Sequence, residues 1–160
     1  MTLAAYTKTL ALVAVVLFFL LPKGGGTSFV FALLFFIVWA LYNVVRLILK
    51  PAERRPRAIR LAIWSATLVA AGATQAHWEN ASREQASEVV NAVLAHKSRT
   101  GSYPASPDEA GINGPALKDE WRIAYRLREG KPELSYPASF MPLTTYEYDF
   151  EARQWKTSAY

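Results

Sequence analysis

The side chains that could support catalysis or metal binding are few and far apart in this 160-residue chain. His77 and His96 are the only histidines, and there is no cysteine. If both histidines lie on one helix, their separation of 19 residues spans about 28 Å, so they cannot share a metal ion. Without cysteine, the chain has no disulfide framework, no thiolate nucleophile and no cysteine-based metal site.

Serine and carboxylate side chains give no stronger indication of chemistry. A serine nucleophile needs a histidine base, and neither Ser102 nor Ser139 has one nearby in the sequence, although folding could still supply His96. Three carboxylates alternate along one later stretch: Glu147, Asp149 and Glu151. We interpret them as the solvated face of a strand rather than a calcium site, because calcium usually gathers its ligands from a loop. We therefore predict no catalytic residue, no metal site and no cofactor, and expect a protein that is not an enzyme.

Charge is divided unevenly between the two halves of the chain. Residues 1–75 hold eight Lys and Arg and one acid, a net charge of +7, whereas residues 76–160 hold ten Lys and Arg and twelve acids, a net charge of −2. Nucleic-acid binding would need a basic face on the soluble part of the chain. The net charge of +5 comes from the apolar half, so we expect no nucleic-acid partner.

Three apolar stretches occupy the first half, and we expect three transmembrane helices. Residues 3–21 would span about 28 Å as a helix, close to the thickness of a bilayer core. A cleaved signal peptide is the alternative for this stretch, but residues 22–26 offer no small-residue cleavage site and form a glycine-rich turn instead. Residues 28–49 are the most apolar span. Residues 61–74 form a weaker third span that continues into a polar helix ending near Thr100, with no Pro or Gly after Gly72.

A basic cluster between the second and third spans sets the expected topology. Six Lys and Arg residues are opposed there only by Glu53, and Pro51 and Pro56 are expected to break any helix. Short loops this basic stay in the cytoplasm. We therefore expect a multi-pass protein of the bacterial inner membrane with a cytoplasmic N-terminus and a C-terminal domain on the outer side, the periplasm of a Gram-negative cell. The topology residues are Arg46, Lys50, Arg54, Arg55, Arg57 and Arg60.

Small residues on the third span predict how it packs. They recur every four residues and would form a ridge on one helix face, which lets helix backbones approach closely in lipid. We expect this ridge to pack against the first two spans: Ala62, Ala66, Ala70 and Thr74. Asn43, late in the second span, either hydrogen-bonds between helices or lies near the headgroups.

The remaining residues predict a small antiparallel sheet packed on the helix, so the fold class is a membrane-anchored α+β protein. Apolar positions with helical spacing give one stripe along the polar half of the helix: Ala86, Val89, Val90, Val93 and Leu94. Ser106 and Pro107 suggest a short helical turn, and strands follow over residues 121–128, 133–136 and 145–151 and around Trp155. The predicted parts are residues 1–60 (two spans and the basic loop), 61–100 (the long helix) and 101–160 (the β domain).

A membrane-rooted helix, a turn element and an antiparallel meander together resemble a type IV pilin or a type II secretion pseudopilin. The turn element is Gly101, Ser102, Tyr103, Pro104, Ala105 and Ser106. Pilins also carry a leader cleaved after a glycine, with a glutamate early in the mature helix, whereas no acid follows Gly26 within its apolar stretch. The resemblance therefore implies the shape of the outer domain, not processing into a filament.

An apolar loop between predicted strands is the candidate contact for a protein partner, on the side of the domain away from the membrane. Its prolines hold it extended, and Phe and Met are typical interface anchors. Alternatively, its apolar side chains fold back over the sheet. The candidate residues are Tyr136, Pro137, Phe140, Met141, Pro142 and Leu143.

Three functions remain open from the sequence. The first is a non-catalytic inner-membrane protein that binds and restrains a protein partner at the periplasmic face, as a toxin-immunity or accessory protein does. The second is a pseudopilin-like component of a pilus or secretion machine, and the third is a sensor or an enzyme. Membrane lipid and one protein are the partners expected.

Overall fold

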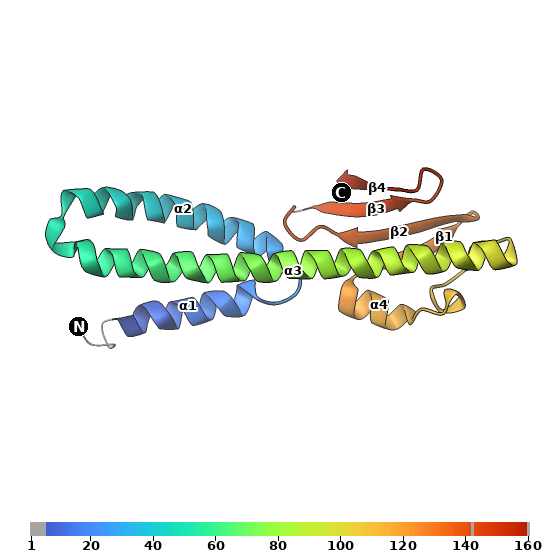
Figure 1. The fold of residues 1–160 in the computed structure, drawn as a ribbon, viewed down its shortest axis with the longest axis horizontal. Coiled ribbons are helices and arrows are strands. Elements are labelled where there is room, and N and C mark those ends of the chain that lie inside the picture. The colour runs from blue at the N-terminus through green and yellow to red at the C-terminus, as the bar shows by residue number, and fades with distance from the viewer. Residues whose placement is uncertain (1–5, 142, 160) are drawn as a thin grey trace. The chain divides into compact units, whose positions relative to one another are not determined.

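The computed structural model describes residues 6–141 and 143–159. The chain forms two compact units, residues 1–78 and 79–160. One continuous 47-residue helix, α3 (Arg54–Thr100), contributes to both units and is the longest element in Figure 1. The predicted class, α+β with a long helix and a small antiparallel sheet, is confirmed.

The first unit is a helical hairpin packed along the first part of α3 (Figure 1). It consists of α1 (Thr7–Leu20), α2 (Gly26–Leu49), the short helix η2 (Pro51–Glu53) and α3 as far as Trp78. Its core is formed by Leu20, Leu68 and Ala71, with Phe29 and neighbouring apolar side chains packed against them. Gly72 allows a close approach, since a Cβ atom there would lie 2.9 Å from Phe29 Cζ.

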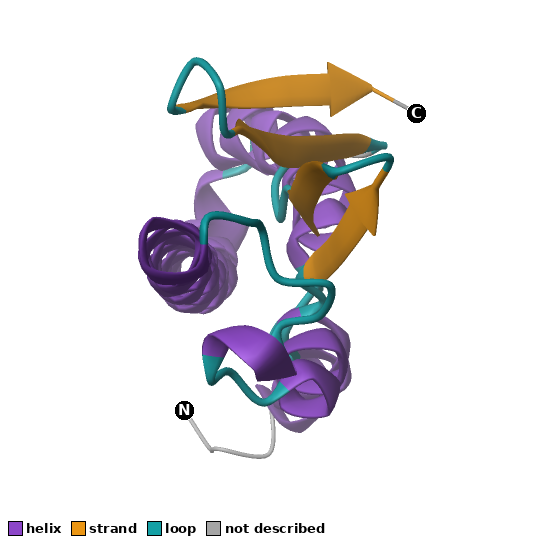
Figure 2. Cartoon of the chain, turned by 90° about the vertical axis from the view of Figure 1, so that its right-hand side faces the viewer, coloured by secondary structure: helices purple, strands orange, loops and turns teal. Residues whose placement is uncertain are grey.

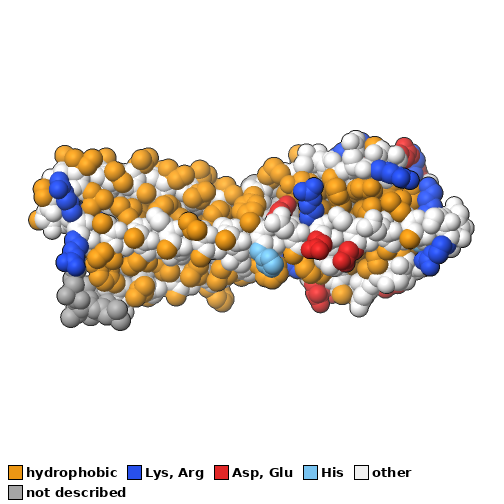
Figure 3. Space-filling view, in the orientation of Figure 1, with side chains coloured by type: hydrophobic (Ala, Val, Ile, Leu, Met, Phe, Trp, Pro, Cys, Tyr) orange, Lys and Arg blue, Asp and Glu red, His pale blue; other side chains and the backbone are white. Residues whose placement is uncertain are grey.

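Large hydrophobic side chains cover the outside of this unit. Of the 20 that are exposed among the described residues, 18 lie in the first unit, and Figure 3 shows them over its whole visible length. Only one described helix, α2, is long and apolar enough to cross a membrane, and only 6% of its most apolar stretch is buried. A buried core helix of a soluble protein would be mostly covered, so this helix is not one.

The three predicted spans differ from the observed helices. The described part of the first span is the 14-residue helix α1, and residues 3–5 lie outside the described residues. The third span is not a separate element, because it forms part of α3. Three membrane-crossing helices were expected. By length and composition alone, only one of the described helices could cross a membrane.

The helix start and the packing face of the third span are also corrected. Pro56 does not break the helix, because it lies in the first turn of α3, where a backbone N–H has no helical partner to lose. The predicted ridge does not pack against the other helices, since Ala62, Ala66 and Ala70 are exposed and Thr74 is only half-buried. A different face is buried: Thr67, Leu68, Ala71 and Gln75.

The second unit is a four-stranded antiparallel sheet packed on the remainder of α3. Its strands are β1 (Ala124–Arg128), β2 (Lys131–Pro137), β3 (Thr144–Asp149) and β4 (Gln154–Ala159), in the order β1-β2-β3-β4. Figure 2 shows them as one twisted sheet. The meander and the four predicted strands are thus confirmed, whereas the first strand begins three residues later than predicted.

Helix α4 (Gly114–Trp121) was not predicted from the sequence. Asn113 caps it, accepting a hydrogen bond from the Ala116 N–H at 3.1 Å, and a proline stands in its first turn. Arg122 ends it in the left-handed region at φ 54°. Before it, η3 (Asp108–Ala110) is the predicted short helical turn.

Two hairpin turns hold the sheet in register. Glu129 and Gly130 form the two-residue β1–β2 loop with φ of 52° and 78°, the left-handed pair that matches the twist of a hairpin. At the β3–β4 turn, Asp149 Oδ1 accepts hydrogen bonds from the Glu151 and Ala152 N–H groups at 2.9 and 2.8 Å. These bonds, together with one from Lys156, lower the pKa of Asp149 to about 2.

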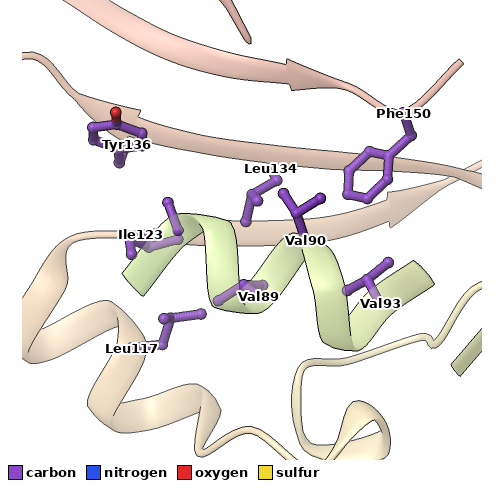
Figure 4. Packing of buried hydrophobic residues seen from close by; sticks show 9 residues of the cluster. Val89, Val90, Val93, Leu117, Ile123, Leu134, Tyr136 and Phe150 are labelled. Carbon is purple, nitrogen blue, oxygen red and sulfur yellow. The ribbon is translucent and has the colours of Figure 1, made fainter. Parts of the chain in front are cut away.

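The core of the second unit lies between α3, α4 and the sheet (Figure 4). The predicted stripe supplies Ala86, Val89, Val90 and Val93 from α3, and Leu94 packs against them. Leu117 from α4 and four residues of the sheet region complete the buried cluster, and all five are labelled in Figure 4: Leu117, Ile123, Leu134, Tyr136 and Phe150. Tyr148 is among the partly buried side chains that pack against it.

Candidate functional site

The loop between β2 and β3, residues 138–143, is the candidate partner-contact site. Its ends are closed by the Ala138 N–H donating to Thr144 O at 2.9 Å, and by the Thr144 N–H donating to Met141 O at 3.3 Å. Backbone hydrogen bonds thus shape the loop between two paired strands. Pro142, one of the predicted contact residues, lies outside the described residues.

Its exposed apolar side chains distinguish this loop from the rest of the second unit. Met141 is 43% exposed and Leu143 is 75% exposed, and these are the only exposed large hydrophobic side chains among the described residues of that unit. Pro137 is exposed and Phe140 is half-buried. Tyr136 was predicted as a contact residue but is 3% exposed, because its position in β2 points it into the core.

Leu143 also has an unusual backbone conformation. Its φ of 58° lies in the left-handed region, which costs a non-glycine residue roughly 1–2 kcal/mol. Three other described non-glycine residues share this region, and all are polar residues at turns or a helix end: Arg122, Glu129 and Arg153. Leu143 is therefore the one apolar side chain that a strained backbone position holds out toward solvent.

The position of the loop within its unit differs from the expectation. The Ser139 N–H donates to Glu79 Oε2 at 2.8 Å. Glu79 is the first residue of the second unit and directly follows Trp78 in α3. The β2–β3 loop is therefore attached where α3 enters the unit, not at the opposite end of the domain.

The polar residues considered for chemistry have structural contacts. His96 Nδ1 lies 3.0 Å from Glu109 O, which ties the end of α3 to the turn that follows it. Asp108 Oδ1 accepts from the Gly114 N–H at 3.1 Å, and Glu109 Oε2 accepts from the Ala105 N–H at 2.7 Å. Among the described residues, no group of three His, Asp or Glu side chains is arranged to hold a metal ion.

Two tyrosines lie in strands β2 and β1, beside the β2–β3 loop and the turn that follows α3. Burial first, and the Glu79 carboxylate second, raise the pKa of Tyr136 to about 12. Burial likewise raises the pKa of Tyr125 to about 12. The Tyr125 hydroxyl donates to Pro104 O at 2.7 Å, so it fastens the turn after α3 to strand β1.

The predicted topology residues gather around the connection between α2 and α3. Arg54 Nε donates to Leu47 O at 2.9 Å, at the end of α2. Arg57 forms an ion pair with Glu53 and donates through Nη1 to Asn43 Oδ1 at 3.1 Å. Asn43 therefore forms the interhelical hydrogen bond that was one of its two expected roles. The guanidinium group of Arg57 holds the pKa of Glu53 below its ordinary value.

Comparison with known proteins gives no relative for this chain: no family model, no curated protein and no solved structure matches it. The pilin resemblance therefore depends on the turn element and the order of the elements alone.

Proposed function

We propose that this chain is a multi-pass protein of the bacterial inner membrane that binds and restrains a protein partner at the outer, periplasmic face, without catalysing a reaction. In this proposal α1, α2 and the first part of α3 all cross the bilayer, the N-terminus is cytoplasmic, and the second unit lies outside. A toxin-immunity or accessory protein would have this form.

The distribution of exposed apolar side chains supports the membrane location. Soluble proteins rarely expose large contiguous apolar patches, whereas the described residues of the first unit include 18 exposed large hydrophobic side chains. Lipid would cover them. Trp78 suits the outer boundary, because its ring lies 5.2 Å from Lys23 Nζ and its Nε1–H donates to Leu21 O at 3.3 Å.

The length of α3 fits a crossing by its first part. Arg60 and Trp78 are 18 residues apart in the helix, which corresponds to about 27 Å, close to the hydrocarbon thickness. The basic connection between α2 and α3 would then lie on the cytoplasmic side, as the positive-inside rule requires.

The observation that carries the binding function is the exposure of Met141 and Leu143, whereas the other large hydrophobic side chains described in the second unit are buried or half-buried. Backbone strain at functional contacts is common, and Leu143 has it. In the proposed topology the bond to Glu79 keeps the β2–β3 loop close to the bilayer surface. The partner would therefore be a protein that approaches or is embedded in the membrane.

A pseudopilin-like component of a pilus or secretion machine is the second candidate. It is supported by α3 ending at Thr100, followed by the Gly101–Ser106 turn element and an antiparallel meander. Co-purification from detergent, with the captured protein identified by mass spectrometry, distinguishes the two: a secretion or pilus subunit favours this candidate, and a toxin favours the first.

The topology is tested with alkaline phosphatase fusions. A fusion after Tyr160 should be active and a fusion near Pro56 inactive, because the enzyme folds only outside the cytoplasm. The reverse pattern would overturn the topology.

The contact is tested by photo-crosslinking in intact membranes, with a photoreactive amino acid at position 141 or 143 and, as a control, at the exposed position of Arg128 on the edge strand β1. We expect a protein adduct from the loop positions and none from position 128. The paired change Met141→Ser and Leu143→Ser should weaken capture roughly tenfold or more, the scale of an interface anchor.

The controls separate three outcomes. Arg126→Ser with Arg128→Ser alters the basic face of β1, and loss of capture in that variant alone would move the contact to the sheet. Adducts with phospholipid alone at positions 141 and 143 would show that the loop meets the bilayer, which would refute its role as a protein contact.

A further inference from the structure

A groove of about 610 Å³ runs between the three helices of the first unit, and we call it the α1–α2–α3 groove. Apolar side chains from every helix line most of it. The lining includes Leu12 and Val16 of α1, Phe35 and Phe36 of α2, and Leu68 of α3. A cavity of this size and character suits a hydrocarbon chain.

The charged side chains of the groove are two cations, and they lie at one end with a threonine beside them. Lys8 and Thr9 stand at the start of α1, and Arg60 stands in the second turn of α3. At the other end of the unit, the C-terminal end of α1 lies beside Gln75 of α3, because Gln75 Nε2 donates to Leu20 O at 2.6 Å. Along α1, Lys8 is about 18 Å from Leu20, and along α3, Arg60 is about 22 Å from Gln75.

Neither cation is neutralised within the first unit. Glu53 is the only acidic residue in positions 1–78, and it forms an ion pair with Arg57. Among the ion pairs of the described residues, none involves Lys8 or Arg60. The groove therefore combines a long apolar wall with two unpaired positive charges at its mouth.

We propose that the α1–α2–α3 groove binds one anionic phospholipid of the cytoplasmic leaflet, with the phosphate between Lys8 and Arg60 and an acyl chain along the helices. Charge complementarity selects the occupant: basic pockets between transmembrane helices on the cytoplasmic side hold anionic headgroups. Trp39 and Trp64, which also line the groove, are side chains typical of the headgroup boundary. The leaflet assignment rests on the proposed topology, whereas the binding chemistry does not.

The test measures lipid binding to the full chain, delipidated in a neutral detergent, by native mass spectrometry. Phosphatidylglycerol is the probe, and phosphatidylcholine is the zwitterionic comparison. The wild-type protein should bind one phosphatidylglycerol in preference to phosphatidylcholine. Lys8→Gln with Arg60→Gln should weaken binding about thirtyfold, since each basic side chain near an anionic headgroup contributes about a factor of five.

Two further variants separate a groove site from general surface attraction. Lys50→Gln with Arg55→Gln removes the same charge from exposed residues at the α2–α3 connection that do not line the groove, and should leave binding unchanged. Leu12→Trp fills the groove from a side chain that is 55% exposed, keeps both cations, and should weaken binding about tenfold.

Each result decides the proposal. Equal binding of the two lipids, unchanged binding by the Lys8 and Arg60 variant, or equal losses in both charge variants would overturn it. Unchanged binding by Leu12→Trp would overturn the groove as the site. Because lipid binding in detergent does not depend on orientation, a failed topology experiment would move the site to the other leaflet without affecting these measurements.

Discussion

Replacing Gln75 should loosen the packing of α1 against α3 more than any other single change of similar size. Its side chain is completely buried, and Nε2 donates to two backbone oxygens, Leu20 O at 2.6 Å and Pro22 O at 3.0 Å. Leu20 O belongs to the last turn of α1, where backbone carbonyls have no helical partner. Gln75 therefore caps one helix from the side chain of another.

The magnitude follows from the atoms that change. Gln75→Met keeps an unbranched side chain of similar length but removes both donors. Loss of the bond to the buried Leu20 O costs about 2 kcal/mol. Pro22 O still accepts from the Gly25 N–H at 3.0 Å, so loss of the second of its two bonds costs about 1 kcal/mol. Gln75 Oε1 is buried and has no hydrogen-bond partner among the described residues, so its removal returns about 1 kcal/mol. The net loss is about 2 kcal/mol, a thirtyfold change in the opening equilibrium.

Hydrogen exchange of the full chain in detergent, read on peptides covering the end of α1 and residues 70–78, measures that equilibrium. Gln75→Glu gives the decisive comparison, because a glutamate has nearly the shape of glutamine but at neutral pH would direct a carboxylate at two carbonyl oxygens. We expect hydrogen exchange in these peptides to be slowest in the wild type, faster in Gln75→Met and fastest in Gln75→Glu. Thr74→Val is the control, since it removes only a bond within α3, to Ala70 O. If Gln75→Glu exchanges like the wild type, shape and not hydrogen bonding holds the helices together, and this reasoning is wrong.

Two changes test the second unit. Tyr125→Phe should destabilise it by about 1–2 kcal/mol, because the carbonyl oxygen of the buried Pro104 loses the hydroxyl donor that lies 2.7 Å away. Chemical denaturation followed by tryptophan fluorescence measures this loss, and an unchanged midpoint would contradict it. Asp149→Asn should destabilise the unit at neutral pH but less as the pH falls. The folded pKa of Asp149 is lowered to about 2, so its stabilising effect is present above about pH 4 and is lost between about pH 4 and pH 2. Thermal midpoints of the wild type and the variant should therefore converge over that range, and a constant difference would contradict the assignment.

Periodic stretches of sequence predicted the structure best. The stripe at Ala86, Val89, Val90 and Val93 was predicted as a core face, because apolar residues with helical spacing lie on one side of the helix and only that side needs to be buried. Alternation along the later strands predicted the meander for the same reason. Helix α4 was missed because its eight residues hold too few apolar positions to show a period, although Asn113 and the following Gly and Pro are an identifiable start signal.

The face of α3 that packs in the first unit could not be predicted from residue size. The alanines at positions 62, 66 and 70 form a ridge by spacing, but apolar residues occur on every face of that segment, so spacing alone does not select the buried one. The buried face is the one that brings Gln75 to the end of α1, which is a three-dimensional relation between residues 55 positions apart. The groove could not be predicted for the same reason, because Lys8 and Arg60 are far apart in the sequence and line one cavity only in the folded chain.

The order in which the core of the second unit is synthesised has a consequence for biogenesis. Four of its nine buried residues lie on α3 and leave the ribosome before any strand has been made. The strands that follow pair only with their sequence neighbours, so the sheet itself closes through short-range contacts. The helix must wait for Leu134, Tyr136 and Phe150 before its stripe is covered. A nascent chain stopped before β2 would lack all three of these residues and would present that stripe to chaperones and proteases, so completion of the sheet is a checkpoint for the survival of the whole protein.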